Sequence, residues 1–507
     1  MSILLKRRFL LIFSILSSMI FFIVLLVVGF LPVKYLLLIL VLLALAFLTL
    51  YRCEKDKHHE HPIKTIILKM LHLLLSLILI IASIYIGKTN NFLSTITGGK
   101  DQIITVDVVV SSSKHYNNIK ELKDGTFGIN TSKDSIVLTK AKATLQSDLE
   151  LDEDLNVTDY EEDASELYAL TQSSIDAVII KESDYEDFLD ENESYEDITE
   201  VLYQIEVRIA AVSANSANVT KEAFCVYISG CDKTGDIDRG DALSDVNMLA
   251  VVNPNTRQIL MVSIPRDYYV DIIDNGTNIG KDKLTHSAKK YMQCQLGTVS
   301  NLLDCDINYY AKFNFTSFMN VIDALGGTIR IKIPNYDTYS GDGTFTTKKG
   351  HYTFKCGETY DMTSKQALCF VRERKSFVKG DEVRGKNQML MLKAIIKKCC
   401  STAILTHMDS IFNSLSSSFD TNMSSKEVKA LINFQLNDNQ AWDLQSYRLT
   451  GDSSIRTTQL ATVGEANVIR ANPNGLFICQ PDEESVSTAK EYIQQVLTTD
   501  EPLNIKD

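Results

Sequence analysis

The chain has 507 residues, too many for one ordinary domain, so two or three folded units are expected beside any membrane segment. Its formal net charge of −13 is concentrated in one stretch. Residues 148–200 hold 21 Asp and Glu against one Lys, a net of −20, which leaves +7 for the remainder. This acidic balance argues against nucleic-acid binding by the whole protein, while the basic surplus elsewhere leaves room for an anion site.

Three apolar runs dominate the first 90 residues, over 9–31, 35–50 and 65–86. Each is near the roughly 17 to 25 residues that span a bilayer, whereas a secretory signal peptide has a single short run. Basic residues precede the first run and fill the loop after the second: Lys6, Arg7, Arg8, Arg52, Lys55, Lys57 and Lys64. By the positive-inside rule, the N-terminus is cytoplasmic. We therefore expect a multi-pass protein of the cell membrane, with three transmembrane helices in residues 1–90 and the large C-terminal part extracellular.

Residues 100–218 show the alternation of short strands and helices expected of a small α/β accessory domain. Segments rich in Val and Ile predict strands over 103–110, 126–130 and 175–180, and a helix is expected over 133–145. The acidic residues of this region are interpreted as a solvated face. Small and polar residues over 210–220 are typical of a linker, which separates this domain from the next.

A larger domain is expected over residues 222–500, with a mixed sheet and enough length to bury a sizeable core. Its predicted strands cover 224–229, 246–252, 258–264, 328–333 and 366–374, and the second and third form a hairpin. Its predicted helices cover 315–325, 387–398 and 486–497. The sequence therefore predicts an α/β protein with a membrane anchor, an accessory domain and a mixed-sheet domain.

Cysteine usage does not indicate a disulfide-stabilised fold. Ten cysteines are too few for a disulfide framework in a chain of this length, and no C-x-x-C pair occurs. The pairs Cys225/Cys231 and Cys294/Cys305 are the nearest candidates for a single bridge, with ordinary buried thiols as the alternative.

Arginines that suit an anion site lie at two predicted strands of the larger domain. Arg266 and Asp267 follow Pro265 at the end of one strand. Arg372 and Arg374 are two residues apart in another, so both guanidinium groups are expected on one face. The alternative for each group is an ordinary ion pair or a solvated sheet face.

Two further groups extend this set. Arg384, Lys386 and Gln388 open a predicted helix, and Arg384 and Gln388 lie on one side of it because they are four residues apart. Asp232 and Asp245 flank the polar loop after the first strand of the domain. The alternative for the first group is an ordinary helix surface.

The combination of arginines and carboxylates predicts phosphoryl chemistry. Arginine forms bidentate contacts with phosphate, and a helix N-terminus favours an anion. Mg²⁺ uses one or two carboxylates together with substrate oxygens. Metal and arginines would then stabilise the charge that develops on a pyrophosphate. The sequence has no Ser-His-Asp, Cys-His or P-loop signature.

Five short motifs follow one another in order in the larger domain. They are Ser244-Asp245-Val246-Asn247-Met248, Ser263-Ile264-Pro265-Arg266-Asp267-Tyr268-Tyr269-Val270, Asp282-Lys283-Leu284-Thr285-His286, Asp323-Ala324-Leu325-Gly326-Gly327, and Phe370-Val371-Arg372-Glu373-Arg374 with Arg384-Gly385-Lys386-Asn387-Gln388 after it. Their order and spacing resemble the LytR-CpsA-Psr family over about Phe224 to Leu497. The expected membrane-anchored, outward-facing arrangement agrees with this resemblance independently.

The resemblance implies a cell-wall ligase. Such an enzyme moves teichoic acid, capsule or a similar polysaccharide from a polyprenyl-pyrophosphate carrier to peptidoglycan and forms a phosphodiester link. The resemblance implies that Asp232 and Asp245 hold Mg²⁺ (or Mn²⁺) and that Arg266, Arg372 and Arg374 are catalytic. It also implies a hydrophobic tunnel that holds the lipid.

The same resemblance assigns Arg384 and Gln388 to binding of the pyrophosphate, and Lys386, from the start of the same predicted helix, is a further candidate for this contact. One position departs from the family pattern. The family usually has Arg two residues before the second metal aspartate, where this chain has Leu243. Arg239, from the same loop, is the candidate substitute, and without it one phosphate contact is missing.

Three functions are open at this point. The first is the ligase, the second is a polyprenyl-pyrophosphate hydrolase that uses water as acceptor, and the third is a non-catalytic envelope assembly or regulatory protein that senses lipid-linked polymer. The arginines and the carboxylate pair favour the first two, because a scaffold has no need of a phosphate clamp. Leu243 is the strongest point for the third. The sequence names neither the polymer nor its acceptor.

Overall fold

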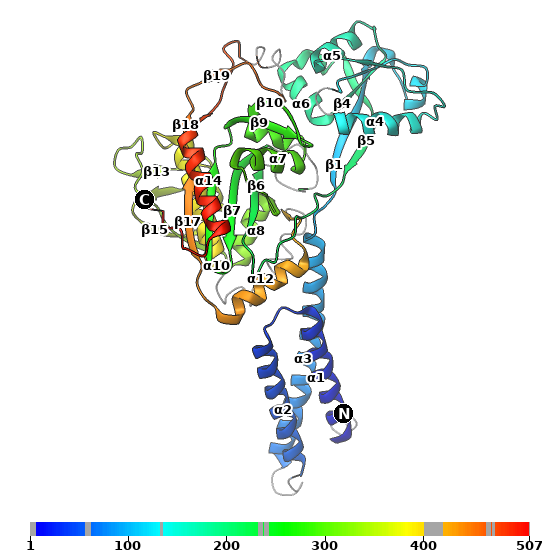
Figure 1. Cartoon of the computed structure of the whole chain (residues 1–507). Helices are drawn as coiled ribbons and strands as arrows, with labels where there is room; N and C mark the ends of the chain where they lie inside the picture. The colour runs from blue at the N-terminus through cyan, green and yellow to red at the C-terminus, as the bar shows by residue number, and fades with distance from the viewer. Residues whose placement is uncertain are drawn as a thin grey trace.

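The computed structural model describes residues 7–55, 62–131, 135–231, 237, 243–399, 419–462, 468 and 472–505. A helical stem carries two α/β units (Figure 1). The five-stranded unit spans residues 102–209, and the six-stranded unit begins at residue 224 and includes the C-terminal helix. The expected mixed α/β fold is therefore confirmed.

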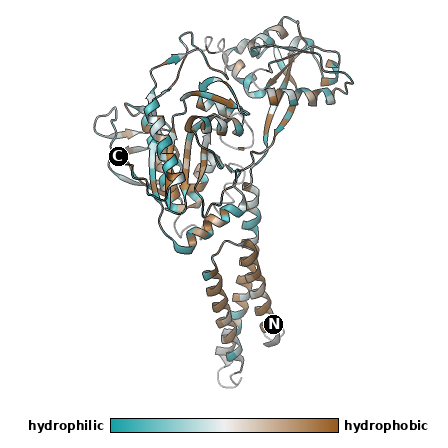
Figure 2. Ribbon diagram, in the orientation of Figure 1, coloured by the Kyte–Doolittle hydropathy of each residue, from teal (hydrophilic) through white to brown (hydrophobic). Residues whose placement is uncertain are grey.

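The stem consists of α1 (Arg7–Val28), α2 (Val33–Lys55) and α3 (Pro62–Ile96). It is the most hydrophobic part of the molecule (Figure 2), and apolar side chains such as Leu42 and Ile78 are half exposed. In the described residues, two segments are long and apolar enough to cross a membrane, Phe9–Val28 and Lys69–Ile96, while the apolar part of α2, Val33–Thr49, is shorter. These apolar helices indicate membrane anchoring, and the number of spans stays a prediction.

Helix α3 continues ten residues beyond the predicted apolar run and reaches the six-stranded unit. It ends before Gly98 and Gly99, whose φ angles of 93° and 79° glycine adopts without strain. The Gly98 amide donates to the Met423 carbonyl at 3.0 Å, and the Gly99 amide donates to the Thr421 carbonyl at 2.7 Å. The upper end of the stem is thus hydrogen-bonded to the six-stranded unit.

The five-stranded unit has the strand order β3-β2-β4-β1-β5, with β1 antiparallel to both of its neighbours. Its elements are β1 (Gln102–Ser111), η1 (Ser112–Lys114), η2 (Ile119–Leu122), β2 (Phe127–Ile129), α4 (Ser135–Asp148), β3 (Val157–Asp159), α5 (Asp163–Thr171), β4 (Ala177–Lys181), α6 (Glu182–Glu191), η3 (Glu193–Tyr195) and β5 (Thr199–Ile209). The central strand β4 is buried throughout because helices cover both faces of the sheet. The three predicted strands and the predicted helix all occur here.

The six-stranded unit is built on a sheet of order β16-β11-β6-β7-β8-β17. Its strands are β6 (Phe224–Cys231), β7 (Ser244–Asn253), β8 (Gln258–Ile264), β11 (Tyr309–Asn314), β16 (Phe419–Asp420) and β17 (Asp443–Arg448). Its helices are η4 (Leu284–Lys289), α7 (Met292–Leu303), α8 (Phe315–Ala324), α9 (Ser364–Arg372), α10 (Gly380–Cys399), α12 (Ser425–Asp438) and α14 (Glu483–Thr498). The predicted hairpin of β7 and β8 is confirmed, with Asn253 opposite Gln258.

Alternate residues of the central strands enter two separate cores. On one face, Tyr227, Val251 and Val262 pack with α7 and α14. On the other face, Met248 and Met261 pack with α10 and α12. Because both faces are covered, these strands are nearly continuous apolar runs, as strands buried on both faces are.

Five small two-stranded sheets complete the unit. They pair β9 (Tyr269–Asp274) with β10 (Thr277–Lys283), β12 (Thr328–Lys332) with β15 (Thr359–Thr363), β13 (Thr344–Thr346) with β14 (Thr353–Lys355), β18 (Gly451–Asp452) with β21 (Gln480–Pro481), and β19 (Arg456–Thr457) with β20 (Leu476–Phe477). The β13–β14 hairpin packs on α9 through Phe345, Phe354 and Phe370. This contact places the turn of the hairpin beside the end of α9.

The predicted strand over 366–374 is wrong, because most of this segment is helix α9. A capping box starts the helix: the Thr363 hydroxyl accepts from the Gln366 amide, and the Gln366 side chain accepts from the Thr363 amide. The buried residues Ala367, Phe370 and Val371 then follow helical spacing. In the sequence, the apolar run is too short for its spacing to distinguish a helix from a strand.

The cysteines of the two candidate pairs form no disulfide bond. Cys225 lies beside Cys305 instead of Cys231, and hydrogen bonding to that thiol together with burial raises its pKa. These cysteines therefore act as small buried residues.

Candidate functional site

A cavity of about 470 Å³ lies in the six-stranded unit between the sheet, α8, α9 and α10. Most of the predicted site residues line it: Asp245, Arg266, Arg372, Arg374, Arg384 and Gln388. Apolar side chains form much of the remaining wall, including Phe313, Phe315, Phe318, Leu392 and Ile395. Residues separated by more than 140 positions in the sequence thus meet in one amphiphilic cavity.

Asp245 and Arg266 face the cavity from neighbouring antiparallel strands. Asp245 is the second residue of β7, and Arg266 follows the end of β8, opposite this part of β7. The Arg266 Nη1 donates to Asp245 Oδ1 at 2.5 Å, and Arg266 Nε lies 3.4 Å from Asp267 Oδ2. Both partners of the Arg266–Asp245 pair remain partly exposed, so ligand atoms can reach them.

Arg372 and Arg374 flank a buried carboxylate at the end of α9. Glu373 caps the helix with extended backbone (φ −70°, ψ 130°) and is 4% exposed. In extended backbone the residues on either side of a position point the same way, so both arginines face the cavity. The Glu373 carboxylate points the other way, into the protein, where it accepts from the Lys348 and Ser376 amides. The predicted common face is therefore present although the predicted strand is not. The Arg372 guanidinium lies over the Phe315 ring, with Cζ 4.1 Å from its centroid, which orients it.

Helix α10 supplies Arg384 and Gln388, which are one turn apart and both line the cavity. The helix begins at Gly380, earlier than predicted, so Arg384 lies in its second turn and not at its N-terminus. The expected help from free N–H groups of a helix N-terminus is therefore not provided at Arg384. At this position only the guanidinium group of Arg384 can contact an anion, without help from the helix backbone.

Lys386 does not line the cavity, so the geometry does not support its predicted contact with the pyrophosphate. Two residues along a helix turn a side chain by about 200°, so Lys386 points away from Arg384 and Gln388. It is exposed and forms an ion pair with Glu382, Nζ to Oε1, at 2.8 Å. The ion pair lowers the pKa of Glu382 and is a helix-surface interaction.

Asp232 and Arg239 lie outside the described residues. The strands on either side of their loop are described, and Cys231 of β6 is paired with Ser244 of β7. The loop thus leaves and re-enters the sheet next to Asp245. Leu243, at the position where the family usually has Arg, is partly buried and does not line the cavity.

The Asp282-Lys283-Leu284-Thr285-His286 motif forms a buried anchor instead of part of the cavity. Asp282 Oδ1 is 2.7 Å from His286 Nδ1, and Asp282 Oδ2 accepts from the Thr462 amide at 2.7 Å. Burial opposes the charge of Asp282, but the hydrogen bonds from His286 and Thr462 outweigh it and lower the pKa. This motif ties η4 to residue 462, far along the chain.

Several lining residues escape sequence analysis. Lys348 and Lys349 come from the turn between β13 and β14, and Lys375 follows the arginines of α9. The described part of the cavity lining holds seven cationic residues and two acidic ones, Asp245 and Glu373. A Lys-Lys pair in a turn matches no sequence motif, so only its position beside α9 in the structure shows that it lines the cavity.

Among the described residues, no group of three or more His, Cys, Asp or Glu side chains is arranged to hold a metal ion. The only described carboxylates of the cavity lining are Asp245 and the inward-pointing Glu373. A cation of the Mg²⁺ type would fit Asp245 only as one of a few ligands, with the others from a phosphate and water. The geometry therefore defines a cationic, amphiphilic cavity that suits a phosphate with an apolar substituent.

The LytR_cpsA_psr family model matches residues 186–491, more than half of the chain. The TagU polyisoprenyl-teichoic acid–peptidoglycan teichoic acid transferase of Bacillus subtilis (strain 168) is 32% identical over 279 residues, which is 55% of this chain and 79% of that protein. TagU of Enterococcus faecalis is 32% identical over 42% of this chain and 65% of that protein. The solved structure of TagT bound to LI-WTA is 25% identical, with a TM-score of 0.43, over 57% of this chain and all of that one.

The chain belongs to the LytR_cpsA_psr family. The resemblance seen in the five sequence motifs is thus confirmed. The matched region starts at residue 186, within α6, and so includes β5 of the five-stranded unit in addition to the six-stranded unit.

Proposed function

We propose that this protein is a membrane-anchored transferase that moves a glycopolymer from a polyprenyl-pyrophosphate carrier to peptidoglycan. The observation that carries the proposal is the amphiphilic cavity, in which four arginines face a wall rich in aromatic and aliphatic side chains. A polyprenyl pyrophosphate has this same division between charge and hydrocarbon. Family membership and the similarity to TagU support the same function.

In the proposed reaction, an acceptor hydroxyl of peptidoglycan attacks the phosphorus that bears the glycan. A new phosphodiester bond forms, the bond from that phosphorus to the bridging oxygen breaks, and polyprenyl phosphate leaves. Arg372 and Arg374 offer forked donors to the pyrophosphate oxygens, and Arg266 and Arg384 approach from the sheet and from α10. Donors that contact the bridging oxygen stabilise the charge that it gains as the bond breaks.

We further propose that Asp245, together with Asp232, holds Mg²⁺ or Mn²⁺. The support is that the carboxylate of Asp245 lies in the cavity among cations that would hold the phosphates. When bound, the metal would neutralise charge on the phosphate oxygens. Arg266, which hydrogen-bonds to Asp245 Oδ1, would orient that carboxylate from the neighbouring strand.

The membrane arrangement that we propose has three spans in residues 1–90, a cytoplasmic N-terminus and both α/β units outside. It is supported by the three apolar helices and by the Lys and Arg residues that precede the first apolar run and follow the second. Residues 100–218 would then be an accessory domain and residues 222–500 the transferase domain. Protease added to intact protoplasts should digest the α/β units, and their full protection would contradict this topology.

The transfer activity is tested with the purified full-length protein, a polyprenyl-pyrophosphate-linked glycan and peptidoglycan. We expect polymer to become attached to peptidoglycan while polyprenyl phosphate is released in equal amount. Release without any attachment would indicate the hydrolase, with water as acceptor. Donor binding without release of polyprenyl phosphate, in the presence of Mg²⁺ and acceptor, would indicate a non-catalytic sensor.

A further inference from the structure

Three lysines of the cavity are not used by the reaction described above. Lys348 and Lys349 lie in the turn between β13 and β14, and Lys375 lies three residues beyond the end of α9. All three are exposed, whereas the apolar side chains of the cavity wall are half-buried or buried. They therefore form an outer rim on the cavity.

The fold holds the two segments of this rim together through Glu373. One carboxylate oxygen of Glu373, Oε2, accepts from the Lys348 amide at 2.6 Å, and the other, Oε1, accepts from the Ser376 amide at 3.0 Å. The Ser376 hydroxyl also donates to the Thr346 carbonyl at 3.0 Å. Because these hydrogen bonds involve the main chain of both segments, they place the lysines beside one another.

The rim concentrates positive charge. The side chain of Lys375 lies beside that of Lys348, and hydrogen bonding to that amine together with repulsion between the two positive charges lowers the pKa of Lys375. Among the described residues, no carboxylate forms a salt bridge with any of the three lysines. Like charges held in contact are unfavourable, and a bound anion would relieve the repulsion.

The lining of the cavity changes from apolar on one side to cationic on the other, which gives a bound donor a preferred orientation. Phe318, Leu392 and Ile395 form an apolar wall, and Ile395 also packs against the cluster that contains Val28 and Leu93 of the stem. Lys348 and Lys349 of the rim belong to the β13–β14 hairpin, which lies farther from the stem than α12 does (Figure 1). A donor with its lipid on the apolar wall and its pyrophosphate at the arginines would lead its glycan out past the lysines.

We propose that Lys348, Lys349 and Lys375 form a second anion site, which binds a phosphate group within the glycan of the donor polymer. This inference rests on the proposed function and narrows the substrate to phosphate-bearing polymers of the teichoic-acid type. Lysine ammonium groups bind phosphate as compact point charges and do not require one fixed geometry. Such a site suits the repeating phosphodiesters of a polymer, whose position along the rim can vary.

The test compares three ligands for the full-length protein in detergent: polyprenyl pyrophosphate alone, the same lipid with a neutral glycan, and the same lipid with a glycan that contains phosphodiesters. The variant carries Lys348→Gln, Lys349→Gln and Lys375→Gln. The matched control carries Lys332→Gln, Lys355→Gln and Lys365→Gln, which remove the same charge from exposed positions of the same region that do not line the cavity.

We expect the rim variant to bind the phosphate-bearing ligand about tenfold more weakly at low salt, with a smaller loss at high salt, because exposed ion pairs are weak singly and screened by ions. Its affinity for the other two ligands should change by less than about twofold, as should all affinities of the control. An equal loss for all three ligands would assign the lysines to the pyrophosphate and overturn the proposal.

Unchanged affinity for every ligand would show that the lysines are ordinary surface charges, which also overturns the second site. A rim variant that binds every donor normally, but needs more peptidoglycan for half-maximal rate, would assign the lysines to the acceptor's carboxylates. Failure of the unmutated protein to bind polyprenyl pyrophosphate at all would refute the proposed function itself, and so is distinguishable from failure of this inference.

Discussion

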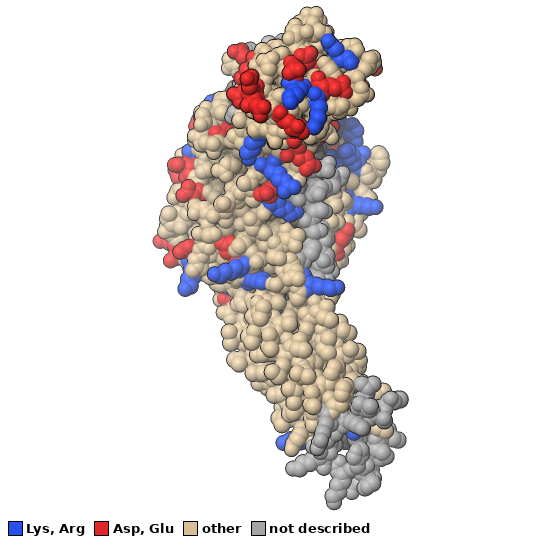
Figure 3. Space-filling model, turned by 90° about the vertical axis from the view of Figure 1, so that its right-hand side faces the viewer, with Lys and Arg blue, Asp and Glu red and all other residues tan. Residues whose placement is uncertain are grey.

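The two α/β units of this protein are built alike and carry opposite charge. Each buries its sheet between helices, and β4 in one unit and β8 in the other are buried along their whole length. Residues 148–200 of the five-stranded unit carry a net charge of −20, and Figure 3 shows Asp and Glu gathered over that unit. The described lining of the cavity in the six-stranded unit holds seven cations and two carboxylates. The shared architecture thus explains why the sheets of both units are buried. The cationic cavity depends instead on the particular side chains at one end of the six-stranded sheet.

A buried aspartate in each unit shows the same contrast on a smaller scale. Asp107 of β1 has its pKa raised to about 6, mainly by burial, and the nearby Glu182 and Glu186 add to the effect against a hydrogen bond from Gln204. Asp282 is equally buried, but hydrogen bonds from its neighbours lower its pKa. Burial alone therefore does not fix the sign of the shift, because hydrogen bonds to the charged form can outweigh desolvation.

The largest effect is expected from Asp245→Ala. It should reduce transfer to the limit of detection and remove Mn²⁺ binding measured by calorimetry, because no other described carboxylate of the cavity lining faces the arginines. The exposed Asp361→Ala on β15 is the control, and it should change neither quantity. Normal transfer by a folded Asp245→Ala protein would refute the metal site.

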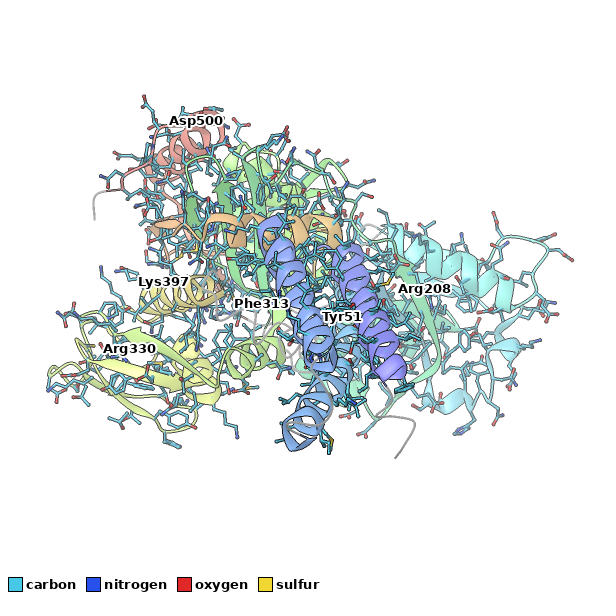
Figure 4. The ribbon with its side chains drawn as sticks, turned by 90° about the horizontal axis from the view of Figure 1, so that it is seen from below. Tyr51, Arg208, Phe313, Arg330, Lys397 and Asp500 are labelled. Atoms are coloured by element: carbon cyan, nitrogen blue, oxygen red, sulfur yellow. The ribbon has the colours of Figure 1, made fainter. Side chains whose placement is uncertain are left out.

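The next effect concerns the arginines of α9. Arg372→Ala or Arg374→Ala should lower turnover of a polyprenyl-pyrophosphate donor by about a hundredfold, since donors aimed at developing charge contribute roughly 2.7 to 4 kcal/mol to the barrier. Lys at either position should restore little, because it lacks the guanidinium fork. Arg330→Ala on β12, which lies at the periphery of the molecule (Figure 4), should change turnover less than about threefold. Equal effects at all three positions would contradict the assignment.

Asp282→Ala tests the buried anchor of the six-stranded unit. It leaves the donors of His286 and Thr462 without a buried acceptor, so we expect the free energy of unfolding to fall by about 3 kcal/mol. Because folding lowers the pKa of Asp282, its contribution is complete above the ordinary value of 3.8 and is lost as pH falls through the folded pKa. Thermal unfolding of mutant and unmutated protein at pH 7 and at low pH measures both effects. A stability difference between the two proteins that grows at low pH would contradict the lowered pKa of Asp282.

Asp107→Asn should have the opposite effect in the five-stranded unit. Folding raises the pKa of Asp107 from 3.8 to about 6, so its contribution is complete below 3.8 and is lost as pH rises to 6. The neutral Asn side chain should therefore stabilise that unit by about 2 to 3 kcal/mol at pH 7.5 and leave it nearly unchanged at pH 3.5. Hydrogen exchange of the β1 and β4 amides reports on this unit separately. Destabilisation at pH 7.5 would contradict the raised pKa.

The smallest effect is expected at Lys386. Its side chain points away from the cavity and pairs with Glu382, so Lys386→Ala should change turnover less than about threefold. Arg384→Ala, half a turn away on α10, should reduce turnover by about a hundredfold. A large effect at Lys386 would show that the substrate reaches this outer face of α10.

Sequence alone determined much of this protein because local signals were strong. Long apolar runs indicated the stem helices, and Val- and Ile-rich segments indicated β1 and β6 to β8. The motifs around Asp245, Arg266 and Arg372 identified the family before any geometry was known. Where local signals conflicted, the prediction failed: the apolar run of α9 suggested a strand, and its capping box decided for a helix.

Only the tertiary structure decided which charged side chains meet. Helical spacing puts Arg384 and Gln388 on one side of α10 and Lys386 on the other, but only the packing of the helix decides which side lines the cavity. The lysine rim depends on a hairpin that hydrogen bonds from Lys348 and Ser376 hold against the end of α9, and no spacing in the sequence encodes this contact. A site made from distant segments is set by their packing, and packing is a property of the folded chain as a whole.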